Sequence, residues 1–221
     1  MLTLIRILFG CLFVGMASTA CAALGEQAPE PIAPTVAGAL TTSNELTDKL
    51  DRLTIADPGP MTGYTRDRFG QPWRDTDGNG CDQRSDVLIR DADSVRVDSR
   101  HSCRVIAIVL LDPYTGKRLD RTRDIQIDHV VPLAAAWRAG ASQWSDAARE
   151  RFATDETNLL AVDGPTNERK GDKTPDQWKP PSEGVWCLYA KIYVATSDSY
   201  RLSITAATHD ALASMLARCR Q

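Results

Sequence analysis

The chain has 221 residues, and its 29 acidic and 26 basic side chains give a formal net charge of −3 at pH 7. A molecule with a net negative charge lacks the broad basic surface that gives tight nonspecific binding to nucleic acid, so any contact with nucleic acid must be local. A mature length of about 200 residues is enough for a single domain with a substantial core.

The first segment, residues 1–22, has the pattern of a secretory signal peptide. Arg6 precedes the apolar segment 7–16, and small residues follow it. The apolar segment is too short to cross a bilayer as a helix and no later segment replaces it, so we expect an exported protein, secreted or periplasmic, whose mature form is a soluble monomer. Small-residue cleavage and a degraded lipoprotein signal both fit the sequence around Cys21, so a lipid anchor at Cys21 stays open.

Four cysteines remain once residues 1–22 are removed: Cys81, Cys103, Cys187 and Cys219. In an exported protein this number indicates two disulfides. We expect Cys81 to pair with Cys103 and Cys187 with Cys219, because each bond closes a local loop. Each should stabilise the fold by about 3 kcal/mol on the loop-entropy account. The alternative, a zinc site built from all four thiolates, lacks the usual Cys-x-x-Cys pair.

Residues 23–42 are rich in Ala, Pro and Thr, which is typical of a flexible leader before a folded domain at 43–221. A capped helix is predicted from Ser43, and its leucines recur at helical spacing: Leu46, Leu50 and Leu53. The next segment, 58–80, is rich in turns and carries three aromatic side chains: Tyr64, Phe69 and Trp73. For these aromatics, core or lid positions are favoured over base-stacking platforms.

The segment 75–80 matches the start of a calcium-binding loop, with Asp86 at the twelfth position, where Glu is usual. Because Cys81 follows directly and no flanking helix is evident, we interpret the segment as a turn beside a disulfide. Several charged residues come next, and ion pairs are favoured over substrate contacts for them: Asp82, Arg84, Asp86, Arg90 and Asp91.

The centre of the chain predicts an α+β fold. A β-branched segment at 103–111, a turn at 112–117 and an alternating segment at 118–131 predict a β-hairpin whose second strand ends at Asp128 and His129. The later elements are predicted as helices, apart from one short apolar strand at 159–162; the helices lie at 132–139, 145–152 and 166–170, with a mostly helical tail at 185–218.

Residues suited to catalysis lie where the second predicted strand ends and where a later helix begins. A carboxylate and an amide oxygen suit Mg²⁺ or a similar hard ion, so we expect Asp128 and Asn167 to be metal ligands. The imidazole of His129 can accept a proton from water near neutral pH. Arg169 and Lys170 can hold phosphate oxygens. Together these groups meet the needs of metal-assisted phosphodiester hydrolysis.

Linked motifs across residues 73–219 resemble the HNH endonucleases, and within them the exported relatives of the HNH domain at the C-terminal end of GmrSD-type restriction enzymes. The motifs lie at 77–84, 112–116, 128–133, 158–167 and 170–172. The resemblance implies a ββα-metal core with His129 as general base and Asp128 and Asn167 as metal ligands. It also implies that Asn158 is the asparagine that braces the ββα loop.

The sequence departs from the family pattern at the last histidine, because Asn167 stands in its place. This departure weakens any assignment of zinc or nickel, and the expected cofactor is a divalent ion, Mg²⁺ with Mn²⁺ as the alternative. The remaining histidines, His101 and His209, lie outside the motif and are expected to be surface or structural residues.

The main functional hypothesis is an exported HNH endonuclease that hydrolyses DNA, with RNA as an alternative substrate. One competing hypothesis is a catalytically inactive envelope binding protein or lipoprotein that keeps the same fold, since a fold alone does not establish function. Another is a metal-dependent phosphodiesterase for small substrates. An assay of plasmid cleavage with different metal ions separates the first hypothesis from the second.

Overall fold

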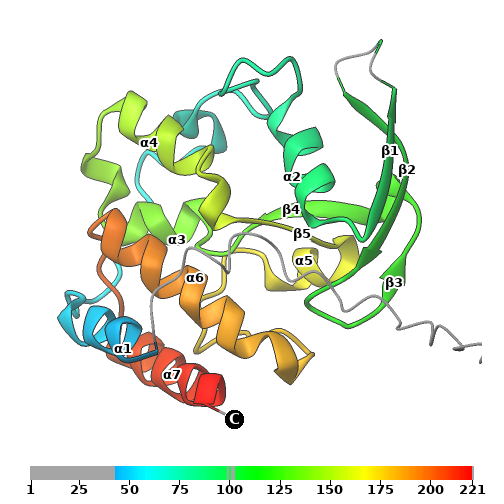
Figure 1. The fold of residues 1–221 in the computed structure, drawn as a ribbon. Helices are drawn as coiled ribbons and strands as arrows, with labels where there is room; N and C mark the ends of the chain where they lie inside the picture. The colour runs from blue at the N-terminus through cyan, green and yellow to red at the C-terminus, as the bar shows by residue number, and fades with distance from the viewer. Residues whose placement is uncertain (1–42, 99, 101–102, 221) are drawn as a thin grey trace, which may run out of the picture. The chain divides into compact units, whose positions relative to one another are not determined.

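The computed structural model describes residues 43–98, 100 and 103–220 (Figure 1). The predicted signal peptide 1–22, the predicted leader 23–42 and the lipidation site Cys21 lie outside these residues, and so does His101. The chain divides into two units, 1–30 and 31–221, and every described residue belongs to the second. No helix in the described part of the chain is long and apolar enough to cross a membrane.

The described residues form an α+β fold, as the sequence predicted. Its helices are α1 (Ser43–Arg52), α2 (Gln83–Asp91), α3 (Leu133–Arg138), α4 (Asp146–Ala153), α5 (Gly164–Lys170), α6 (Trp186–Ser199) and α7 (Ala206–Leu216). Its strands are β1 (Ser94–Asp98), β2 (Arg104–Leu111), β3 (Arg118–Leu119), β4 (Ile125–His129) and β5 (Leu159–Asp163). Among the short 3-10 helices, η2 (Arg66–Phe69), η3 (Thr122–Asp124) and η5 (Glu156–Asn158) bear on the site.

The strands form two separate antiparallel sheets, one with the order β1-β2-β3 and one that contains β4 and β5. The predicted hairpin exists, but its second strand ends at Leu119 and does not continue to His129. The prediction of one strand over 118–131 was wrong because η3 interrupts it. Strand β4 instead pairs with β5, from Ile125 opposite Asp163 to His129 opposite Leu159.

The β4–β5 pair is buried on both faces, which explains why β5 reads as a continuous apolar sequence. One face carries Leu160 and Val162 into the larger core. The other face joins a smaller core beneath α2 and β2, which contains Val87, Leu88, Ile108, Leu110, Ile125, Ile127, Leu159 and Ala161. The pair therefore lies between two packed layers that fix its position.

Helix α1 packs against α6 and α7 (Figure 1). Its predicted apolar positions, Leu46, Leu50 and Leu53, are all buried in the larger core. Both predicted disulfides are confirmed, with Cα–Cα distances of 5.0 Å for Cys81–Cys103 and 5.1 Å for Cys187–Cys219. The second bond ties the start of α6 to the end of the described chain.

Candidate active site

Strand β4 and helix α5 bring three of the predicted site residues to one cleft. Asp128 and His129 end β4, Asn167 lies in the middle of α5, and all three line a cleft with a volume of about 400 Å³. Helix α5 packs on both β4 and β5. Its start is fixed because the Asp163 carboxylate accepts hydrogen bonds from the backbone N–H and the hydroxyl of Thr166, at 3.0 and 2.6 Å.

The carboxylate of Asp128 is held from two sides at the buried wall of this cleft, where only 4% of the residue is exposed. Its Oδ1 accepts a hydrogen bond from Lys170 Nζ at 2.8 Å, and its Oδ2 accepts one from the Tyr114 hydroxyl at 2.5 Å. Burial raises the pKa of Asp128, and the contact with Lys170 opposes that rise. Each carboxylate oxygen has a second lone pair, so each can still coordinate a cation.

The ammonium group of Lys170 is fully buried and belongs to the support of the site. Besides Asp128, its Nζ donates to the carbonyl oxygen of His129 at 2.8 Å. The group therefore links α5 to two consecutive residues of β4, and the phosphate role predicted for Lys170 does not fit this position. The other predicted phosphate ligand, Arg169, is exposed, donates to Thr166 Oγ1 at 2.7 Å and is not among the residues that line the cleft.

The imidazole of His129 is oriented by the end of α4. Its Nε2 lies 2.8 Å from the carbonyl oxygen of Ala153. Because a carbonyl can only accept a hydrogen bond, Nε2 carries the proton and Nδ1 keeps its lone pair. Burial, together with the nearby charges of Arg66 and Lys170, lowers the pKa of His129 to about 4, and the bond to Ala153 opposes this shift. The ring is therefore neutral at neutral pH, as a general base must be.

Asn158 does not line the cleft but holds the backbone that follows His129. The side chain is fully buried, and its Oδ1 accepts a hydrogen bond from the Val131 backbone N–H at 2.8 Å. Its Nδ2 donates to the Val131 carbonyl oxygen at 3.1 Å, and the Val130 N–H donates to the Asn158 carbonyl oxygen at 2.9 Å. The geometry is that of a brace across the β4–β5 loop, so Asn158 is a positioning residue.

The side-chain amide of Asn167 is oriented by its neighbour on β4. Its Nδ2 donates to Gln126 Oε1 at 2.9 Å, and Gln126 Nε2 donates in turn to Glu168 Oε1 at 2.9 Å. These bonds leave Oδ1 of Asn167 as the atom that can accept. The described residues contain no group of three or more His, Cys, Asp or Glu side chains placed to hold a metal ion. One carboxylate and one amide oxygen fit a hydrated hard cation such as Mg²⁺ better than zinc.

Two cations in the cleft wall were missed by the sequence reasoning. Arg66, from η2, and Arg84, from the first turn of α2, both line the cleft. We expected Arg84 to form an ion pair, but its guanidinium instead donates to two backbone carbonyl oxygens, those of Ile125 at 2.8 Å and Thr122 at 3.2 Å. Neither arginine could be placed from its spacing, because both lie far from Asp128 in the sequence.

The other charged residues near α2 have structural partners. Asp82 caps the helix by accepting from the Ser85 N–H at 2.7 Å. The expected pair Arg90–Asp91 is present, with 2.7 Å between Arg90 Nε and Asp91 Oδ1. Asp86 accepts from Asn79 Nδ2 at 3.1 Å.

The segment 75–80 is a hydrogen-bonded turn that precedes the disulfide. The carboxylate of Asp75 accepts from the backbone N–H groups of Gly78 and Gly80 at 2.8 and 2.9 Å, and these bonds lower the pKa of Asp75. Gly78 and Gly80 have φ of 75° and 87°, values that favour glycine. This geometry supports the interpretation of the segment as a turn.

The aromatic side chains of the preceding segment divide between the core and the cleft. Phe69 is buried in the larger core, as expected. Tyr64 and Trp73 are half-buried and line the cleft. Trp73 has a φ of 58°, an uncommon conformation for a bulky residue, which the surrounding packing maintains.

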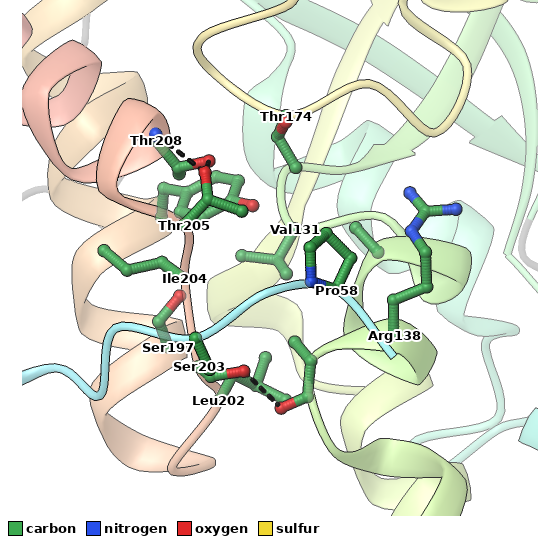
Figure 2. Close-up of a pocket in the computed structure, with 14 residues that line it drawn as sticks. Pro58, Val131, Arg138, Thr174, Ser197, Leu202, Ser203, Ile204, Thr205 and Thr208 are labelled. Carbon is green, nitrogen blue, oxygen red and sulfur yellow. Dashed lines mark hydrogen bonds between the residues drawn. The ribbon is translucent and has the colours of Figure 1, made fainter. Parts of the chain in front are cut away.

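A second pocket, between the C-terminal helices and α3, lacks the groups needed for phosphodiester chemistry (Figure 2). Its volume of about 40 Å³ has room for a few water molecules and not for a nucleotide. Its hydroxyl groups bond locally: Ser203 Oγ donates to the Ala139 carbonyl oxygen at 3.3 Å, and the hydroxyls of Thr205 and Thr208 lie 2.9 Å apart. The cleft beside Asp128 is therefore the candidate active site.

Comparison with known proteins places the chain in a family. Over 203 residues it is 38% identical to a protein of Arthroderma benhamiae described as an uncharacterized secreted protein, and the match covers 91% of this chain and 96% of the relative. No solved structure matches the chain. Residues 82–215, more than half of the chain and including all four residues Asp128, His129, Asn158 and Asn167, match the family described as GmrSD restriction endonucleases, C-terminal domain. The chain therefore belongs to the family of GmrSD restriction endonuclease C-terminal domains.

Proposed function

We propose that this protein is an exported, metal-dependent endonuclease of the HNH type that hydrolyses phosphodiester bonds in DNA, with RNA as an alternative substrate. The observation that carries the proposal is the convergence of Asp128, His129 and Asn167 on one cleft, in an antiparallel strand pair followed by a helix. That arrangement corresponds to the two strands and one helix of a ββα-metal core. Membership of a restriction endonuclease family supports the same reaction class.

His129 acts as the general base in this mechanism. Its Nδ1 takes a proton from a water molecule while the water oxygen forms a bond to phosphorus, and the bond from phosphorus to the leaving sugar oxygen breaks. The bond from Nε2 to the Ala153 carbonyl fixes the tautomer and the ring plane before substrate arrives. A base that is already oriented contributes about 10²- to 10⁴-fold in rate.

Asp128 and Asn167 would hold the divalent cation, Mg²⁺ or Mn²⁺, through one carboxylate and one amide oxygen. The bound cation would neutralise charge on the phosphate and on the leaving oxygen. Lys170 and Tyr114 keep the Asp128 carboxylate in place, which pre-forms half of the site. Arg66 and Arg84 supply the positive charge at the cleft wall, while the phosphate role predicted for Arg169 remains a prediction.

Export is supported by three observations: the predicted signal peptide at 1–22, the two disulfides, and a relative described as secreted. Disulfides persist mainly in oxidising compartments. We propose a protein secreted or held in the periplasm, and lipidation of Cys21 remains a separate question.

The decisive experiment is plasmid cleavage by the purified protein with Mg²⁺, Mn²⁺, Ca²⁺ or EDTA. The wild type should cleave with Mg²⁺ or Mn²⁺ and not with EDTA. His129→Ala should lose at least about 10²-fold in rate while it still binds metal, because its imidazole is assigned to proton transfer. His209→Ala, at a histidine on α7 outside the cleft, is the matched control and should cleave like the wild type.

Asn167→Ala belongs in the same experiment because it should lose metal affinity, measured by calorimetric titration with Mn²⁺. Wild-type cleavage by His129→Ala, or a loss of activity in that variant that is explained by loss of metal alone, would contradict the mechanism. A wild type that cleaves nothing under any metal condition would instead favour the inactive binding protein.

A further inference from the structure

A second groove adjoins the candidate active site and shares one residue with it. This groove has a volume of about 470 Å³ and is lined by Asp82, Arg84, Ser85, Leu88, Arg104, Val105, Thr122 and Arg123. Arg84 lines both the groove and the catalytic cleft. We refer to this set of residues as the arginine groove.

The charge of the arginine groove is locally positive although the whole chain is acidic. Three arginines stand against one carboxylate, Asp82, whose Oδ1 is already engaged as the cap of α2. Arg104 is exposed at the start of β2, and Arg123 is 75% exposed and lies 3.8 Å from the Asp124 carboxylate, at the limit of ion-pair contact. Such a local basic surface is the only kind that an acidic protein can offer to a polyanion.

The arginines come from three different elements that the fold brings together. Arg84 lies on α2, Arg104 begins β2, and Arg123 lies on η3. The Arg84 guanidinium is held against the Thr122 and Ile125 carbonyl oxygens, and because it forms no ion pair with a carboxylate there, its charge is not neutralised. A fixed cation between two grooves is suited to contact a phosphate that lies between them.

We propose that the arginine groove binds the sugar-phosphate backbone of the nucleic acid beyond the bond that is cleaved. In this arrangement the strand passes from the catalytic cleft over Arg84 and along Arg104 and Arg123. The inference rests on the proposed nuclease function, and it adds a substrate contact surface outside the reacting phosphate. It implies that the protein binds long strands more tightly than short ones.

The test measures oligonucleotide binding in a protein that cannot cleave. His129→Ala is titrated into fluorescent single-stranded DNA of about 4 and about 12 nucleotides, which spans the usual range of site sizes. The titrations are repeated from about 50 to about 200 mM salt. Arg104→Ala and Arg123→Ala are then added together to this background, and the pair Arg52→Ala and Arg151→Ala, at exposed positions on α1 and α4, gives a control with the same change in net charge.

The groove variant should bind the longer strand about tenfold more weakly than its parent, and the slope of log affinity against log salt should fall by about 2, one unit for each lost phosphate contact. The shorter strand should be affected less, and the control pair should match the parent. Replacement of the same two arginines by lysine should keep most of the salt dependence, because the charge is retained.

An unchanged affinity in the groove variant, an equal loss in the control pair, or equal losses for both strand lengths would overturn the inference. The same holds if the His129→Ala parent binds neither strand. Plasmid cleavage by the wild type is scored separately, so a failure of the nuclease proposal is distinguished from a failure of the arginine groove.

Discussion

The two sheets of this protein differ in what surrounds them. The β4–β5 pair is buried on both faces, and its polar side chains are held by hydrogen bonds and one buried ion pair. The β1–β2 strands are largely exposed, with Val95, Val97, Ile106 and Leu111 open to solvent. The buried pair can keep reacting groups in fixed positions, whereas the exposed sheet can present side chains to a large partner. A nuclease needs both, and this chain places them next to each other.

The largest effect is expected from Lys170→Met. This change leaves the buried Asp128 carboxylate without its cation and should reduce the free energy of unfolding by about 3–5 kcal/mol. Urea denaturation measures the loss, and Lys173→Met, at an exposed lysine three residues along, is the control.

A second variant separates charge from packing at the same position. Lys170→Met combined with Asp128→Asn should recover much of the lost stability, because no buried charge remains, while nuclease activity stays absent. A single Lys170→Met variant as stable as the wild type would mean that the pair is not needed to hold the strand.

An intermediate effect is expected from Asn158→Ala. The Val131 N–H and carbonyl groups lose their partners inside the protein, which should cost about 1–3 kcal/mol of unfolding free energy. Because His129 lies two residues before Val131, kcat should fall while KM for plasmid stays near the wild-type value. Asn158→Asp keeps the acceptor for the Val131 N–H and should recover part of kcat. A fall in stability with unchanged kcat would show that Asn158 only supports the fold.

The smallest effect is expected in the exposed sheet. Ile106 is 48% exposed on β2, and Ile106→Thr should change the unfolding free energy by no more than about 0.5 kcal/mol. The same substitution at Ile127, which is 6% exposed on β4, buries a hydroxyl and removes core contacts, so it should cost about 2 kcal/mol or more. Thermal unfolding of the two variants compares the sheets directly, and equal losses would remove the distinction drawn between them.

The sequence predicted the elements better than their partners. The leucine spacing of α1, the helical tail and the local cysteine pairs all agree with the structure. The partner of β4 was not predictable in the same way, because an apolar strand fits any neighbour that buries it. The 3-10 turn that separates β3 from β4 has no glycine or proline to mark it.

Several roles at the site depend on burial, which spacing does not reveal. A lysine at the end of a short helix usually reaches solvent, but Lys170 is directed inward because Asp128 waits for it there. Tyr114 lies in a segment read only as a turn, yet its hydroxyl bonds to the same carboxylate. Arg66 and Arg84 reach the cleft only because the chain before β4 folds back over it.

The bond between Cys81 and Cys103 joins the residue before the cap of α2 to the residue before Arg104. It therefore ties together the two walls of the arginine groove, one of which carries Arg84 and the other Arg104. Thiols stay reduced in the cytosol and pair after export. The covalent link across the groove is thus absent while the chain shares a compartment with the genome of the cell that makes it, and it forms only where foreign or discarded nucleic acid is met.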